Sequence, residues 1–214
     1  MFAVIACLVG ICIILAAAEL LWRRKILEGE EQRKFVHIST GVFVAFWPWL
    51  ISWRSIQLIG LAMLLGVLIN RRQKSLHFSG NIRMEGYGDV CFALAIILIA
   101  SLTTTPIFFA LAIFHLALAD GLAAVIGKNF GKDLRYKVFH QPKTVIGSMT
   151  FWFISVCILG TGLLFASSLI PFQTYVLLVV GLPPILTILE NVTGMGLDNI
   201  VVPVGVIVAL QLTQ

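Results

Sequence analysis

Residues 119–132 read ADGLAAVIGKNFGK, and they place the carboxylate of Asp120 inside an apolar run that begins near residue 107. Charged side chains at membrane depth are rare, and those that occur are mostly functional or paired. A loop rich in glycine and lysine is expected to follow, and a second basic segment, KTVIGS at residues 143–148, opens the next apolar run. Lysines, hydroxyls and glycine backbone are components of phosphate sites. The segment therefore predicts a membrane protein with an anion-binding site near Asp120.

The composition of the chain indicates the same class. Of its 214 residues, 59% are hydrophobic and 12% are charged, and its mean hydropathy is +1.01. Because a soluble domain carries about 25% charged residues, we expect an integral membrane protein. No basic residue precedes the first apolar run, residues 2–22, so we interpret this run as a true span rather than a signal peptide. The four cysteines lie in apolar runs without a CxxC pair, which predicts buried, reduced thiols.

A spanning helix needs about 20 apolar residues, and the chain has eight candidate segments. They predict an all-α integral membrane bundle of seven or eight transmembrane helices, forming one domain over residues 1–214. The third and eighth are short, and Trp47, Trp49 and Trp53 are expected to anchor a tight turn at the membrane interface. The segments are 2–22, 37–53, 55–70, 89–105, 107–127, 145–168, 172–190 and 199–213.

The basic residues predict the orientation. Fourteen of the fifteen lysines and arginines fall in the loops 23–36, 71–88 and 128–144, which eight spans would place on one face. By the positive-inside rule this face is cytoplasmic, with both termini outside, in a prokaryotic inner or plasma membrane. The loop 191–198, with acidic and amide groups, joins the same face. The net charge of +5 thus reflects topology, and no nucleic-acid partner is expected because no aromatic–basic soluble module is present.

Two groups of basic and hydroxyl side chains at this face are candidates for phosphate binding. Arg33 and His37 share a helix face, with Lys34 beside them; the alternative is a basic membrane anchor with an interfacial histidine. Lys143, Thr144, Gly147 and Ser148 bracket a helix start, where free amides bind anions or where ordinary capping occurs. Lys128 and Lys132 lie in a stretch that is one residue too short for a Walker A loop and has Asp133 where Ser or Thr is required.

The carboxylates are candidates for a hard cation such as Mg²⁺. Asp120 is the strongest candidate because of its depth. Asp89, in the segment EGYGD at residues 85–89, and Glu190, Asp198 and Asn199, around the last loop, either bind metal or cap helices. His115 lies about 140° around the helix from Asp120, so we expect a core histidine outside the site.

Taken together these motifs resemble a known family. The segment RKFVHISTG, residues 33–41, resembles the RKxxHxxxG opening of phytol kinases and the dolichol kinase group. Residues 119–132 and 143–148 resemble their central signature, and GLDNIVVP, residues 196–203, is similar to the GLDNxxVP close of the phytol kinase branch. Ile146 departs from the pattern, since relatives often carry an acidic or small residue there. The central segment also resembles CDP-diacylglycerol synthases, whose C-terminal KRxxxxKD signature is missing.

The resemblance implies an enzyme that phosphorylates an isoprenoid alcohol, commonly with CTP, at the cytoplasmic face of the bilayer. Its cofactor would be Mg²⁺, and its partners are a membrane lipid alcohol, a nucleoside triphosphate and the bilayer. A CTP-dependent diacylglycerol kinase, a cytidylyltransferase making a CDP-lipid and a small-solute transporter remain open, as do the alcohol and the oligomeric state. The expected catalytic residues are Asp120, Lys143 and His37; the nucleotide-binding residues Arg33, Lys34, Lys128, Lys132, Thr144, Gly147 and Ser148; and the metal ligands Asp89, Asp120, Glu190, Asp198 and Asn199.

Overall fold

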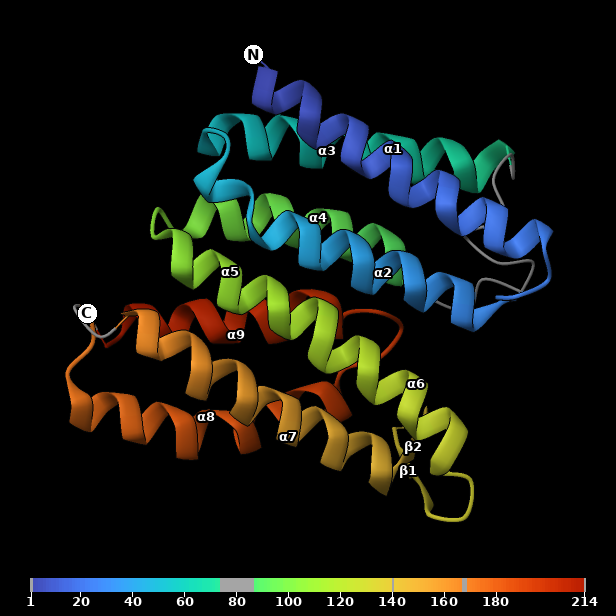
Figure 1. The fold of residues 1–214 in the computed structure, drawn as a ribbon. Coiled ribbons are helices and arrows are strands. Elements are labelled where there is room, and N and C mark those ends of the chain that lie inside the picture. Colours follow the sequence, from blue (N-terminus) through green and yellow to red (C-terminus); the bar gives the residue numbers. More distant parts are fainter. Residues whose placement is uncertain (1, 74–86, 140, 167–168, 214) are drawn as a thin grey trace.

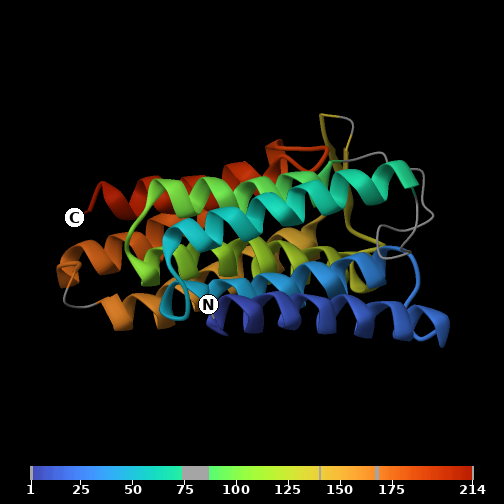
Figure 2. The ribbon, with the colours of Figure 1, turned by 90° about the horizontal axis from the view of Figure 1, so that it is seen from above.

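The computed structural model describes residues 2–73, 87–139, 141–166 and 169–213. Long helices lie side by side in alternating directions, with a small hairpin at one end (Figures 1 and 2). The helices are α1 (Phe2–Arg23), α2 (Glu30–Ala45), α3 (Trp53–Gln73), α4 (Gly88–Leu102), α5 (Pro106–Phe114), α6 (Asp120–Phe130), α7 (Val145–Gly162), α8 (Phe172–Val192) and α9 (Asp198–Gln211), with short 3₁₀ turns η1 (Trp47–Trp49) and η4 (Leu163–Ala166).

The central element is a continuous rod over residues 106–130, made of α5, a π-helical segment η3 (His115–Ala119) and α6. Of its most apolar window, 67% is buried inside the protein, against 29% or less for the other candidate spans. Alanines such as Ala110, Ala112 and Ala117 line this rod and are buried. Small side chains let neighbouring helices approach closely in membrane proteins, and α2, α4, α7 and α9 pack against this rod.

Within the described part of the chain, five helices are long and apolar enough to cross a membrane, namely α1, α3, the 106–130 rod, the 145–166 segment and α8. Two shorter apolar helices, α4 and α9, accompany them. A helical membrane protein is therefore confirmed, while the number of seven or eight spans stays a prediction. The third span is longer than expected, since α3 covers 21 residues, and α2 begins at Glu30, inside the segment 23–36 that was predicted as a loop.

Three further expectations need correction. The stretch 127–130 is not a flexible loop but the last turn of α6, and the chain then forms an antiparallel hairpin of β1 (Arg135–Val138) and β2 (Gln141–Thr144). Trp47 is fully buried and so cannot anchor the membrane interface, whereas Trp49 is exposed. All four cysteines are free, but Cys12 and Cys157 are exposed on the bundle surface.

Close contacts at two glycines fix how the helices pack near the end of the bundle that carries the hairpin. Gly41 on α2 packs directly against Ala117 of the π-helical segment. At Gly127 on α6, an added Cβ would lie 2.6 Å from Thr144 Oγ1 and 3.0 Å from Gly147 Cα. Each contact leaves no room for a larger side chain. Consequently α2 and the start of α7 are both held against the central rod.

Candidate active site

Asp120, the first residue of α6, forms a buried ion pair with α2. Lys34 Nζ lies 2.7 Å from Asp120 Oδ2, and the two side chains are 6% and 12% exposed. His37, one turn further along α2, places Nε2 3.5 Å from the same oxygen. Residues three apart lie on the same helix face, so the start of α2 presents both side chains to Asp120. The structure thus brings together three of the predicted site residues.

His37 has a defined hydrogen-bonding role. Its Nε2 lies 2.8 Å from the carbonyl oxygen of Leu116 in the π-helical segment. A carbonyl can only accept, so Nε2 carries the hydrogen. His37 Nε2 therefore donates to the π-helical segment next to Asp120, and this nitrogen is not free to remove a proton. π-helical turns are frequent at functional sites, and this one directly precedes Asp120.

A cluster of three carboxylates forms where α6, α8 and α9 meet. One oxygen atom from each of Asp120, Glu190 and Asp198 lies within 4.8 Å of the others. Like charges at this separation repel one another strongly in a protein interior. Lys34 offsets Asp120, and Lys143, on β2, forms an ion pair with the Glu190 carboxylate and also donates to its backbone carbonyl at 2.9 Å. The site therefore holds three carboxylates, from α6, α8 and α9, and two lysines, from α2 and β2.

Asn199 lies beside this cluster with one unsatisfied oxygen. Its Nδ2 donates to the Gly88 carbonyl at 2.9 Å, whereas its buried Oδ1 has no hydrogen-bond partner among the described residues. Buried polar atoms are rarely left unpaired, so this oxygen is a candidate ligand atom. Arg33 is near: a Cβ added to Gly88 would lie 3.1 Å from Arg33 Nη1 and 3.2 Å from Asn199 Nδ2.

Gly196 explains how two distant motifs meet. Its φ of +90° is unfavourable for other residues, and an added Cβ would lie 2.5 Å from Gly88 Cα. The Tyr87 amide donates to the Met195 carbonyl at 2.9 Å. The turn before α9 is thus docked, backbone against backbone, onto the start of α4, which sets the position of Asp198 and Asn199.

The second predicted anion site is largely satisfied by internal contacts. Thr144 Oγ1 accepts from the Gly147 amide at 3.0 Å, which is the capping arrangement that the sequence left open. Ser148 Oγ lies 2.5 Å from Tyr136 Oη and 3.0 Å from Asn191 Oδ1. Among the four residues of this motif, Lys143 alone reaches the carboxylate cluster.

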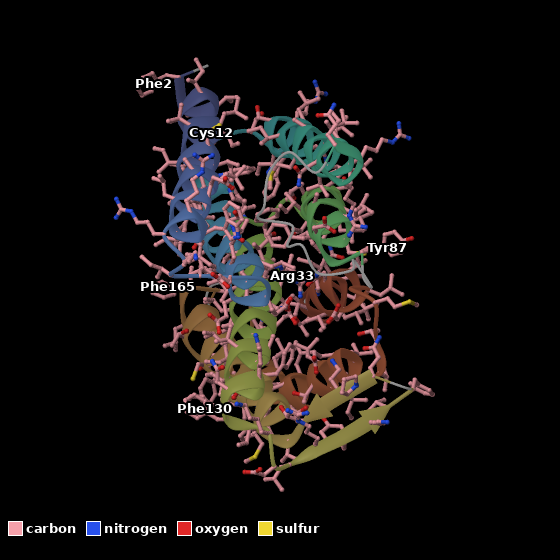
Figure 3. The ribbon with its side chains drawn as sticks, turned by 90° about the vertical axis from the view of Figure 1, so that its right-hand side faces the viewer. Phe2, Cys12, Arg33, Tyr87, Phe130 and Phe165 are labelled. Carbon is pink, nitrogen blue, oxygen red and sulfur yellow. The ribbon has the colours of Figure 1, made fainter. Side chains whose placement is uncertain are left out.

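Other predicted residues are not part of the three-carboxylate cluster. Asp89 forms a two-pronged ion pair with Arg71, whose guanidinium also covers the Tyr87 ring at 5.1 Å. Lys128 and Lys132 are exposed near the end of α6, and Arg33 pairs with Glu30 at 2.9 Å. Glu85 and Gly86 lie outside the described residues. Figure 3 views this end of the bundle, with Arg33, Tyr87 and Phe130 labelled.

His115 is a core histidine, as the sequence predicted, since it is fully buried and its Nδ1 bonds to the Leu111 carbonyl at 2.7 Å. Sequence reasoning missed Tyr136 and Asn191, which connect the hairpin to α7 and α8. Asn191 directly follows Glu190, and this adjacency was the one available signal for it.

Comparison with known proteins identifies the family. The chain is 32% identical over 199 residues to the phytol kinase of Synechocystis sp. (strain ATCC 27184 / PCC 6803 / Kazusa). The aligned region covers 90% of this chain and 83% of that protein. No protein-family model matches the chain, and no solved structure matches it. Because the similarity extends over nearly the whole chain, it confirms the resemblance of the motifs, and the protein belongs to the phytol kinase family of polyprenol kinase-like proteins.

Proposed function

We propose that this protein transfers the terminal phosphoryl group of CTP to an isoprenoid alcohol, such as phytol, at the cytoplasmic face of the membrane. The observation that carries the proposal is the buried Lys34–Asp120 ion pair inside a cluster of three carboxylates. Burying so many charged groups within an apolar bundle costs free energy, so charged groups that are found there are mostly functional. The similarity to a phytol kinase supplies the class of reaction.

Phosphoryl transfer depends mainly on positioning and on charge stabilisation. In the proposed reaction the alcohol oxygen forms a bond to the terminal phosphorus, and the bond between that phosphorus and the bridging oxygen breaks. The alcohol proton passes to the Asp120 carboxylate, and the nucleoside diphosphate leaves. Lys34 and Lys143 neutralise phosphate charge after exchanging their carboxylate partners for phosphate oxygens, and Arg33 binds phosphate from the outer edge of the site.

The residues of the cluster fit a magnesium ion. Asp120, Glu190 and Asp198 supply oxygen atoms from three helices, and the unpaired Oδ1 of Asn199 adds a neutral oxygen. Mg²⁺ prefers carboxylates together with substrate phosphates. When bound there it would offset the negative charge of the triphosphate. Asp89 is not included, because it is not one of the three carboxylates that lie together; it pairs with Arg71 instead.

The preference for CTP is supported by the family resemblance and by the lack of a P-loop motif in the sequence. The central segment is also similar to that of CDP-diacylglycerol synthases, so cytidylyl transfer to a lipid phosphate is the competing reaction. The two reactions release different products. The kinase releases CDP, whereas the cytidylyltransferase releases pyrophosphate.

The test uses purified protein with phytol, geranylgeraniol, farnesol, a polyprenol and diacylglycerol, and separately with a prenyl monophosphate and phosphatidic acid as lipid phosphates. Each lipid is supplied with every nucleoside triphosphate labelled in the terminal phosphate. We expect a labelled prenyl monophosphate, formed faster with CTP than with ATP at equal concentration. Faster reaction with ATP would contradict the proposed donor. A CDP-lipid formed from a lipid phosphate, with release of pyrophosphate, would replace the kinase proposal by the competing one.

A further inference from the structure

The hairpin β1–β2 carries Lys143 to the carboxylate cluster, and its attachment to the bundle determines where this lysine points. Tyr136 on β1 stands directly opposite Lys143 on β2 in the antiparallel register. Side chains of directly opposed residues project from the same face of a hairpin. Tyr136 and Lys143 therefore leave the hairpin side by side.

These two neighbouring side chains contact two consecutive residues at the end of α8. Tyr136 Oη donates to Asn191 Oδ1 at 2.6 Å, and Lys143 Nζ binds the carboxylate and the carbonyl of Glu190. Ser148 on α7 joins the tyrosine contact at 2.5 Å from its hydroxyl oxygen. The Asn191 amide is itself fixed, because its Nδ2 donates to the Thr187 carbonyl at 2.8 Å. A rigid acceptor thus holds the tyrosine hydroxyl.

Among the described residues, Tyr136 is the residue of β1 whose side chain hydrogen-bonds to the helices. β2 continues directly into α7 at Val145, whereas β1 connects to α6 through residues 131–134, where Lys132 and Leu134 are exposed. An isolated two-stranded hairpin is marginally stable in water. The bonds of the Tyr136 hydroxyl to Asn191 and Ser148 supply an anchor on α7 and α8 that a phenylalanine at this position would lack.

We propose that Tyr136 is a positioning residue that fixes Lys143 in the site, so that Lys143 meets Glu190 at rest and nucleotide phosphate during turnover. The role in nucleotide binding rests on the proposed function, whereas the positioning of Lys143 does not. Tyr136 itself makes no contact with the carboxylate cluster among the described side chains. It acts through the lysine opposite it.

The test variant is Tyr136→Phe, and Tyr175→Phe is its matched control. Tyr175 Oη donates to the Gly160 carbonyl at 2.9 Å and so also joins α8 to α7, but at the opposite end of both helices. Each substitution removes one phenolic hydroxyl whose hydrogen bond partners lie on α7 or α8. Only the first one touches the hairpin.

Two readouts are measured. The first is the rate at which an amine-reactive acetylating reagent modifies Lys143 in the folded, nucleotide-free protein, followed by peptide mass spectrometry. The second is the kinetic response to nucleotide. A lost hydrogen bond changes an equilibrium by about three- to tenfold, so Tyr136→Phe should raise Lys143 acetylation and the KM for nucleotide by about this factor, with kcat nearly unchanged. Tyr175→Phe should change neither.

Non-additivity gives a further check. In a Lys143→Ala background, Tyr136→Phe should raise KM no further, because there is no lysine left to position. Unchanged acetylation of Lys143 in Tyr136→Phe, or an equal increase in Tyr175→Phe, would overturn the proposal whether or not the protein is a kinase. An unchanged KM, or an additive rise in the double variant, would overturn the nucleotide-binding part. If the wild-type protein phosphorylates no lipid alcohol, the proposed function fails, and acetylation still decides the positioning role.

Discussion

Lys34 Nζ lies 2.7 Å from Asp120 Oδ2, although 86 residues separate them in the chain. The contact joins the second turn of α2 to Asp120, which directly follows the π-helical segment and begins α6. A buried ion pair contributes little net stability, because desolvation of both charges offsets their attraction. The pair is therefore better explained by chemistry than by folding, and this explanation can be tested on each partner.

Lys34→Met should lower the free energy of unfolding, although methionine has a size and shape similar to those of lysine. It leaves the Asp120 carboxylate buried without its cation, and breaking a buried pair costs about 3–5 kcal/mol. The double variant Lys34→Met/Asp120→Asn removes both charges and should recover most of the thermal stability but no turnover. Melting temperatures in detergent and turnover are the measurements. A double variant no more stable than the single one would show that the ion pair does not set the cost.

The Mg²⁺ concentration needed for activity should rise when a carboxylate of the cluster is replaced, but not when an acidic residue outside the cluster is replaced. Glu190→Gln and Asp198→Asn each remove one ligand charge and should raise the Mg²⁺ concentration needed for half-maximal activity at least about tenfold, since even outer-shell changes cost about that much. Asp89→Asn is the control: it disrupts the pair with Arg71 and should lower stability without altering the Mg²⁺ response. Equal shifts in all three variants would contradict the assigned ligands.

The sequence was sufficient to predict a helical membrane protein and most of the residues that meet in the candidate site. Apolar runs and basic loops indicated a helical membrane bundle, because both patterns are local. Motif spacing also located Lys34, His37, Asp120 and Asp198, since each lies near a helix end at the basic face. Which carboxylates meet could not be predicted in this way. Asp89 and Asp198 both lie in the first turn of a helix at the basic face. Only the tertiary structure shows that Arg71, on another helix, forms an ion pair with Asp89.

Two other features depend on tertiary packing. The π-helical segment 115–119 has no signature in its sequence HLALA, and it becomes apparent only where His37 bonds to the Leu116 carbonyl. The glycines of residues 127–131 were interpreted as a flexible phosphate loop, but Gly127 is required instead for the close approach of Thr144 and Gly147. Glycine marks both kinds of position, and the sequence alone does not distinguish them.

Gly196→Ala should impair the site without touching a charged group. Alanine at a φ of +90° is strained, by about 1–3 kcal/mol, and its Cβ would collide with the Gly88 backbone. We expect a lower melting temperature and lower activity, because Asp198 and Asn199 follow this turn. Gly181→Ala on α8 is the control, since an added Cβ there has open space around it. If both variants behave like the wild type, the turn does not position the α9 residues.

The orientation of the site in the membrane is open to chemical labelling. Asp133, beside the hairpin, and Thr104, between α4 and α5, are both exposed and lie at opposite ends of the bundle. In a cysteine-free background, Thr104→Cys should react with an impermeant thiol reagent in intact cells, and Asp133→Cys should react only after permeabilisation. The reverse pattern would place the carboxylate cluster on the outer face, away from cytoplasmic nucleotide.

The most direct measurement of the central claim is the turnover of purified Asp120→Asn with a prenol and CTP, compared with the wild type at matched folding. The amide has nearly the volume of the carboxylate but neither accepts the alcohol proton nor carries charge for a cation. Loss of a group that acts in the transition state costs about 10²-fold or more, so we predict a decrease of at least that size, with insertion and helix content retained. Near-normal turnover in a well-folded Asp120→Asn protein would contradict the account, because the cluster around Lys34 and Asp120 would then not be the site of phosphoryl transfer.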